Sequence, residues 1–190
     1  MKNFVDKVKK AVQTYLMNRQ LSRRGRNKMV MGMEESKTLG IIFDASTAAD
    51  YRLVMNYVKS IQDTGKRVTS LGFYKTKHKP GYLNDQPNWV YCHPSDFGLG
   101  LQIRNEKIAS FVDTSFDILI DLSPSEIFYT KYLSGMSNAS YKAGRFQSDQ
   151  VDLYDLFIQV PGNIGLQELM NHMNHYLQII KKPVKHAKSV

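Results

Sequence analysis

The sequence predicts an α/β fold, a Rossmann-like three-layer sandwich with a mostly parallel sheet, preceded by an amphipathic basic N-terminal helix. Two observations support this fold class. Short apolar segments alternate with amphipathic segments of helical period along most of the chain, which is typical of a parallel sheet covered by helices on both faces. The chain is also long enough for one such domain, with 190 residues of which 42% are hydrophobic.

The first predicted helix spans residues 3–17. Its apolar residues recur at spacings of three and four, which places them in one stripe along an amphipathic helix. The stripe consists of Phe4, Val5, Val8, Ala11, Val12, Tyr15 and Leu16. Residues 21–33 are rich in cations and methionines, and we interpret them as a hinge or linker. The predicted division is residues 1–36 for helix and linker, 37–182 for the α/β domain, and 183–190 for a basic tail.

A strand, a helix and a second strand are predicted between residues 38 and 74. Residues 39–44 form a short apolar run that ends in an acid, and the amphipathic segment 48–62 follows. Residues 67–74 are rich in β-branched and aromatic side chains. Because a helix joins the two strands, we expect them to pair in parallel with a right-handed crossover. The polar loop 75–87 is long for a connection, and such loops often carry function.

The second half of the chain predicts further strands and helices. The predicted strands are residues 89–92, 108–112, 116–122, 139–143 and 153–160. A capping box, Ser123-Pro124-Ser125-Glu126, predicts a helix that runs to about Leu133. The last helix is predicted to begin at Gly165 and to be stopped by Pro183.

The positive charge is concentrated at the two ends of the chain. Residues 1–28 hold nine Lys or Arg and one acid, and residues 181–190 hold four lysines and no acid. The net charge is +9 overall, so residues 29–180 are mildly acidic. Basic extensions on an acidic body favour a polyanionic partner, because Lys and Arg release counterions from phosphates without a shaped pocket.

We therefore predict a non-catalytic binding or accessory module that contacts RNA or a ribonucleoprotein with its basic termini. The sequence has no helix-turn-helix, zinc-finger or RNA-recognition signature, which argues against sequence-specific DNA binding. Tyr15 is available to stack on a base. The predicted phosphate contacts are Lys7, Lys9, Lys10, Arg19, Arg23, Arg24 and Arg26.

The same helix supports two alternatives. Its apolar stripe and lysines suit the headgroup layer of an anionic membrane surface, although Phe4 is its only strong anchor and it has no Trp. The stripe can instead pack on the body or on a second copy of the chain, in which case the cations only keep the outer face of the helix solvated. The sequence does not specify an oligomeric state.

A catalytic alternative depends on two acids. Asp44 and Asp121 each end an apolar strand, and two carboxylates at one sheet edge can hold Mg²⁺ for a metal-dependent phosphotransferase or nuclease. The competing interpretation is that each acid caps the next helix. We expect no metal, no cofactor and no catalytic residue. The histidines of the last helix lack further ligands, Cys92 and His93 point to opposite faces of a strand, and no phosphate-binding glycine loop is present.

Two segments combine cations with aromatic residues. One is the 75–87 loop, with three lysines and a histidine, and the other surrounds Gly144. If they lie together, they form a cationic surface suited to phosphate or nucleic acid; the alternative is two separate solvated loops. The residues near Gly144 are Tyr141, Lys142, Arg145 and Phe146.

The stretch FDILIDLSPSEIFYTKYLSGMSNASYKAGRF, residues 116–146, resembles the N-terminal half of heptosyltransferase-type glycosyltransferases. The second lobe that binds the nucleotide sugar in such enzymes has no counterpart here, so we do not expect a complete transferase. With LGIIFDAS, FDILIDLS, YKAGRF and DLYDLFIQV in that order, the whole chain is similar to a small α/β family of Bacteroidota for which no activity is established. This similarity implies the fold and leaves the function open.

The sequence also predicts a cytoplasmic location. The single cysteine, Cys92, excludes an intramolecular disulfide, and we expect its side chain to be buried. The N-terminus has no continuous apolar segment of the kind that a secretory signal needs, and no apolar run approaches the length of a membrane span.

Overall fold

The structure, a computed structural model, describes residues 2–124, 127–146, 153–161 and 164–181, and for residues 2–10 it describes the backbone. Within these ranges a single six-stranded sheet has the order β3-β2-β1-β4-β5-β6, and every neighbouring pair is parallel. The strands are β1 (Thr38–Asp44), β2 (Arg67–Phe73), β3 (Trp89–Cys92), β4 (Ile118–Asp121), β5 (Tyr141–Arg145) and β6 (Leu156–Ile158). The predicted α/β fold with a parallel sheet is confirmed.

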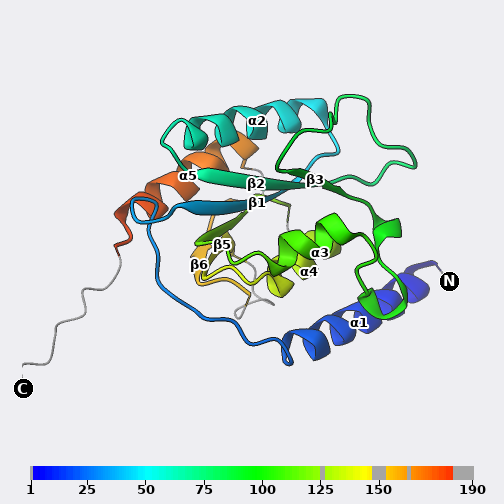
Figure 1. Ribbon diagram of the computed structural model, residues 1–190. Helices are drawn as coiled ribbons and strands as arrows, with labels where there is room; N and C mark the ends of the chain where they lie inside the picture. Colours follow the sequence, from blue (N-terminus) through cyan, green and yellow to red (C-terminus); the bar gives the residue numbers. More distant parts are fainter. Residues whose placement is uncertain (1, 125–126, 147–152, 162–163, 182–190) are drawn as a thin grey trace, which may run out of the picture.

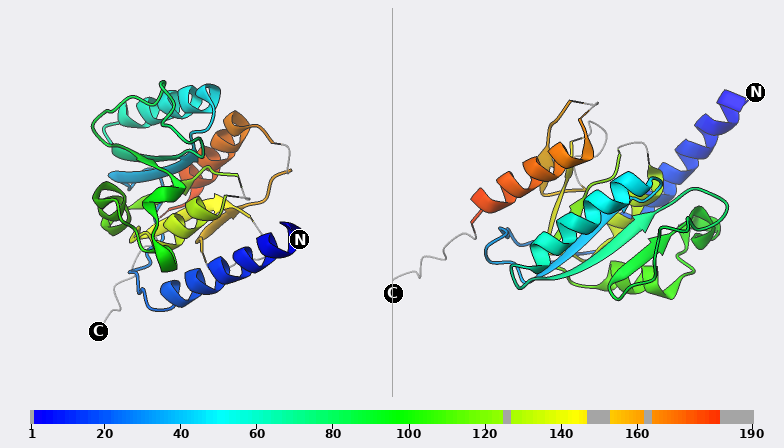
Figure 2. Two further views of the ribbon diagram at one scale, coloured as in Figure 1. Left: turned by 90° about the vertical axis from the view of Figure 1, so that its right-hand side faces the viewer. Right: turned by 90° about the horizontal axis from the view of Figure 1, so that it is seen from above.

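Helices cover both faces of this sheet (Figure 1). They are α1 (Lys2–Leu21), α2 (Ala48–Gln62), α3 (Glu106–Asp113), α4 (Phe128–Met136) and α5 (Leu166–Ile179), with 3-10 turns η1 (Pro94–Asp96) and η2 (Leu99–Leu101). α2 and α5 lie on one face, and α3 and α4 on the other. α1 lies outside the α3–α4 layer, and its N-terminal end extends past the body (Figure 2).

Two hydrophobic clusters fill the space between the sheet and its helices. Along β1, Ile41 and Phe43 belong to the cluster under α2 and α5, while Ile42 belongs to the cluster under α3 and α4. A parallel strand buried on both faces has no polar alternate positions, which is why β1 is almost continuously apolar. The strand order reverses between β1 and β4, so the carboxyl ends of these strands flank the crevice in which doubly wound sheets bind ligands.

The prediction of a strand at residues 108–112 is wrong, because these residues lie in α3. Ile108, Phe111 and Val112 are buried, and their spacing of three and four places them on one helical face. Asn105 begins the helix, since its side chain accepts a hydrogen bond from the backbone N–H of Lys107 at 3.0 Å. Because residues 108–112 are all apolar or small, the sequence pattern did not show which of them share one face, and the helical spacing was missed.

Other element boundaries follow the predictions with local shifts. α2 begins and ends at the predicted residues, 48 and 62. α4 begins at Phe128, later than the predicted start at Pro124, and Ile127 before it provides no side-chain cap. Ser125 and Glu126 of the predicted capping box lie outside the described residues, as does Pro183. β5 extends to Arg145, two residues past its predicted end.

Candidate functional site: the N-terminal helix and the arm

The C-terminal end of α1 packs on the body. Met17 is buried in the cluster under α3 and α4, and Leu21 contacts that cluster. Gln20 links α1 to two further segments, because its Nε2 donates to the carbonyl of Gly100 at 2.6 Å and its Oε1 accepts from the Tyr132 hydroxyl at 2.6 Å. These contacts fix the direction in which the rest of α1 leaves the body.

The opposite side of α1 is exposed. Val12 is 51% exposed and Tyr15 is 65% exposed, and Arg19 one turn further is also exposed. Spacings of three and four place these three residues on one side of the helix, away from Met17 and Gln20. In the described part of the predicted apolar stripe, Val12 and Tyr15 therefore face solvent, whereas Leu16 packs against the cluster under α3 and α4.

The predicted phosphate contacts have different environments. The side chains of Lys7, Lys9 and Lys10 lie outside the described part of the chain, although their backbone is helical. Arg19 and Arg23 are exposed. Two more of the predicted phosphate contacts form ion pairs with acids of the protein itself. The first is Arg24, whose Nη2 lies 2.5 Å from a carboxylate oxygen of Asp113.

Arg26 is the second predicted contact that the protein uses internally. Its Nη2 lies 2.6 Å from both carboxylate oxygens of Asp155, and its Nη1 donates to the carbonyls of Ala139 and Ser140 at 3.2 and 3.0 Å. The side chains of Arg26 and Asp155 are only 9% and 15% exposed. Lys28 lies at 3.8 Å from the same carboxylate and is mostly exposed.

Residues 22–37, which we call the arm, run along the body from α1 to β1. The backbone N–H of Met29 donates to the carbonyl of Ser140, and that of Met33 donates to the carbonyl of Leu177. Met31 is buried in the cluster under α2 and α5. The segment that the sequence predicts as a hinge or linker is therefore attached to the body at several points.

Lys142 lies beneath the arm and is the polar residue that sequence reasoning misplaced. It is only 2% exposed, and its Nζ donates to the carbonyl of Gly135 at 2.8 Å. Burial lowers the pKa of Lys142 to about 7, and the Arg26 cation contributes to the shift. Tyr141 is buried as well, so neither the conditional cationic surface near Gly144 nor the alternative of a solvated loop there describes these two residues. Both lie in β5, which is covered by neighbouring strands and helices.

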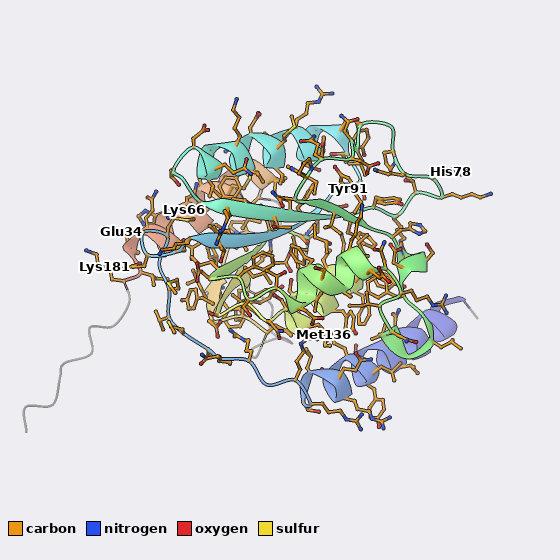
Figure 3. The ribbon with its side chains drawn as sticks, viewed as in Figure 1. Glu34, Lys66, His78, Tyr91, Met136 and Lys181 are labelled. Atoms are coloured by element: carbon orange, nitrogen blue, oxygen red, sulfur yellow. The ribbon has the colours of Figure 1, made fainter. Side chains whose placement is uncertain are left out.

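The 75–87 loop follows β2 and is separated from β5 within the sheet by β1 and β4. His78 projects at its tip, and Tyr91 of β3 lies at its base (Figure 3). Lys79 pairs with Asp85 at 2.6 Å and lies 4.5 Å from the centre of the Tyr91 ring. The hydrogen bond from Lys79 lowers the pKa of Asp85. Lys79 of the loop is therefore engaged by contacts with Asp85 and with Tyr91 at the base of the loop.

Asp44 and Asp121 have separate protein partners. Asp44 accepts hydrogen bonds from the backbone N–H and the hydroxyl of Ser46 at 3.0 and 2.5 Å. It thereby closes the turn before α2, in keeping with a local structural role. Asp121 is 3% exposed and accepts from the hydroxyls of Ser134 and Tyr154 at 2.5 and 2.6 Å. Across the described residues, no group of three or more His, Cys, Asp or Glu is arranged to hold a metal ion.

The structure also places Cys92, His93 and His172, three further residues considered from the sequence. Cys92 is fully buried, as predicted, and burial raises the pKa of its thiol. His93 caps η1, with its Nδ1 at 2.8 Å from the hydroxyl of Ser95. On α5, His172 lies 4.0 Å from Glu168.

One open cavity lies near the amino ends of β1 and β2, where the arm crosses the C-terminal ends of α2 and α5. Its volume is about 510 Å³. Figure 3 shows Glu34, Lys66 and Lys181 at this end of the molecule. Sequence reasoning missed the cavity, because it forms only where three separated segments meet. The lining residues are Met33, Glu34, Ser60, Ile61, Thr64, Lys66, Asn174 and Gln178.

Comparison with known proteins gives one match. Residues 8–180 match the model of a family described as a family of unknown function, DUF6913. No curated protein and no solved structure matches the chain. None of the helices among the described residues is long and apolar enough to cross a lipid bilayer.

Proposed function

The chain belongs to DUF6913, a family of unknown function, and we propose that it is a peripheral protein that uses α1 to bind an anionic membrane surface. The observation that carries this proposal is the exposure of Val12 and Tyr15 on the side of α1 that faces away from the body. In the sequence, the same apolar spacing continues toward the N-terminus through Val8 and Phe4. A helix with one such stripe lies in the plane of the membrane interface and buries that stripe among the acyl chains.

The charge of α1 favours lipid over a second copy of the chain. Residues 2–21 contain five Lys or Arg and a single acid. Two copies of α1 packed stripe to stripe would bring like charges together, whereas anionic headgroups attract them. The cytoplasmic leaflet of cell membranes supplies such headgroups, and we place the protein on that side.

RNA or a ribonucleoprotein is the second candidate partner. Tyr15 and Arg19 are exposed one helical turn apart, and an aromatic ring beside a guanidinium can hold a stacked base and its phosphate. Two observations favour the membrane. Arg24 and Arg26 already have carboxylate partners in the protein, and an apolar stripe gains little from contact with a phosphate backbone.

Vesicle flotation of the full chain tests the proposal. The wild type is mixed with vesicles of phosphatidylcholine alone or with added phosphatidylglycerol, and we expect binding to the anionic vesicles that weakens as salt is added. The double variant V12S/Y15S should lose about tenfold or more in affinity, because it removes the apolar contacts. K7Q/K9Q/K10Q should lose the preference for anionic lipid.

A matched control and an RNA arm separate the candidates. Y176S/I179S removes two exposed apolar residues from α5 and should bind vesicles like the wild type. The same proteins are tested for retention of single-stranded RNA at low salt, with Y15S/R19Q as the diagnostic variant. Wild type that binds RNA and not vesicles would overturn the membrane proposal in favour of RNA, and equal loss in both double apolar variants would show that α1 has no special role.

A further inference from the structure

We infer that the open cavity beside the arm binds a small zwitterion of the amino-acid or dipeptide class, with Glu34 holding its ammonium group and Lys66 its carboxylate. The cavity is separate from α1 and from the crevice beyond the carboxyl ends of β1 and β4. Its volume of about 510 Å³ lies in the range of sites that hold small molecules.

Glu34 and Lys66 bring opposite charges to one cavity without neutralising each other. Both line it, Glu34 from the arm and Lys66 from the turn before β2, and Figure 3 labels both at this end of the molecule. In the described ranges, neither forms an ion pair with the other or with a third residue. A ligand that carries both charges can pair with both residues, whereas an ion of a single charge meets one residue that repels it.

The arm holds both charged residues in place. Lys66 donates from its Nζ to the carbonyl of Ser36 at 2.8 Å, and Ser36 is buried. The backbone N–H of Met33, the residue before Glu34, donates to the carbonyl of Leu177 in α5 at 2.7 Å. An ammonium has three donors, so Lys66 keeps two of them for a carboxylate. Because the arm is already attached, a ligand has little backbone to order when it binds.

The hydroxyl groups of the lining suit the ammonium end of the ligand. Ser60 donates its proton to the carbonyl of Tyr57 at 2.8 Å, and Thr64 donates its proton to the carbonyl of Ile61 at 2.6 Å. A hydroxyl has a single proton, so toward a ligand both oxygens act as acceptors. The C-terminal ends of α2 and α5 also meet at the cavity, and their partial negative charges favour a cation.

The remainder of the lining suits the rest of such a ligand. Asn174 accepts from the Tyr57 hydroxyl with its Oδ1 at 2.7 Å, so its Nδ2 carries the donors that remain for a carboxylate or a peptide carbonyl. Gln178 adds a second amide one helical turn further along α5. Met33 and Ile61 are the apolar members of the lining, and they offer contact to an apolar side chain.

Titration calorimetry of the full chain tests the site. The probes are leucine and the dipeptide alanyl-leucine, and their relative affinities distinguish an amino-acid site from a dipeptide site. Two blocked forms of the dipeptide each remove one charge: the N-acetyl form lacks the ammonium group, and the C-terminal amide lacks the carboxylate. We expect the wild type to bind the unblocked dipeptide about tenfold or more tightly than either blocked form, because each charge makes a charge-assisted contact.

Charge variants identify the group that each residue holds. E34Q should lose affinity for the unblocked dipeptide and for the amide, but should bind the N-acetyl form like the wild type. K66Q should lose affinity for the unblocked dipeptide and for the N-acetyl form, but should bind the amide like the wild type. D63N and K59Q are the matched controls, because they remove exposed charges near the end of α2 that do not line the cavity; both should bind every probe like the wild type.

A blocking variant and the α1 variant complete the test. S60W fills the cavity without changing a charge and should bind none of the probes; since Ser60 is exposed, its Tm should stay close to that of the wild type. V12S/Y15S should bind the dipeptide like the wild type, so failure of the membrane proposal leaves this one standing. Wild type that binds neither leucine nor the dipeptide, or E34Q and K66Q with undiminished affinity, would overturn the site.

Discussion

Nη2 of the Arg26 guanidinium lies 2.6 Å from both carboxylate oxygens of Asp155, a residue 129 positions further along the chain. The same carboxylate accepts the backbone N–H of Lys142 at 2.9 Å. One acid before β6 thus holds the arm and the start of β5 together. The pair is nearly buried, and this distinguishes it from the Arg24–Asp113 pair nearby.

Removal of Arg26 should therefore destabilise the protein strongly. Arg26→Ala leaves the Asp155 carboxylate without its main partner in a partly desolvated position, and loss of one member of a buried pair typically lowers the free energy of unfolding by about 3–5 kcal/mol. Urea unfolding measures the change. Arg24→Ala is the control, because Asp113 is 67% exposed and exposed pairs contribute about 0–1 kcal/mol. Equal small losses in both variants would contradict the role given to Asp155.

Lys142 should make stability depend on pH. Its pKa is about 7 in the folded protein against an ordinary value of 10.5. Between these values the unfolded chain binds a proton that the folded chain releases, so the free energy of unfolding should rise with pH, by at most about 1.4 kcal/mol per unit. This gain in the free energy of unfolding is complete above the ordinary pKa of 10.5, and it is lost as the pH falls from there through the folded pKa of about 7.

Lys142→Met should remove this rise while keeping the length of the side chain. Urea unfolding of both proteins at several pH values between about 7 and 10 gives the comparison. Other lysines titrate equally in both, so they cancel in the difference. Parallel curves for wild type and variant would show that Lys142 keeps its ordinary pKa.

Gly144 should not tolerate a side chain. A Cβ at this position would lie 2.5 Å from the Tyr154 ring, whose hydroxyl donates to Asp121. Gly144→Ala forces that ring to move and should lower the free energy of unfolding by about 1–3 kcal/mol. Gly81→Ala, with nothing within 4 Å of its Cβ, should change it by less than about 0.5 kcal/mol. Thermal or urea unfolding distinguishes the two.

Cys92 should react with thiol reagents only when the protein opens. It is fully buried in β3, and burial raises the pKa of the thiol, so little thiolate is present at neutral pH. A coloured disulfide reagent added to folded protein should react slowly, and urea should accelerate the reaction in step with unfolding. Rapid stoichiometric reaction of the native protein would contradict this burial.

Local sequence patterns predicted most of the sheet and α2, because periodicity and turn residues act over a few positions. They failed at residues 108–112, where a short apolar run fits a strand or a helix equally well and Asn105 decides between them. They could not place Lys142, since a lysine in a strand is ordinarily exposed and only the packing of α4 and the arm shows otherwise.

The candidate site was harder to predict from the sequence than the fold. The cations of residues 1–28 are visible in the sequence, but the acids that bind Arg24 and Arg26 lie 89 and 129 positions away. No local pattern joins such residues. Conversely, the apolar stripe of α1 was visible from its spacing, and the structure adds that Val12 and Tyr15 face away from the body while Leu16 packs on it.

The two outermost strands of the sheet are among its shortest: β3 has four residues and β6 has three. Outer strands present unpaired backbone groups on which a strand of another molecule can add, and few residues offer few such groups. Edge-to-edge aggregation therefore has little template in this sheet, even when many copies crowd together.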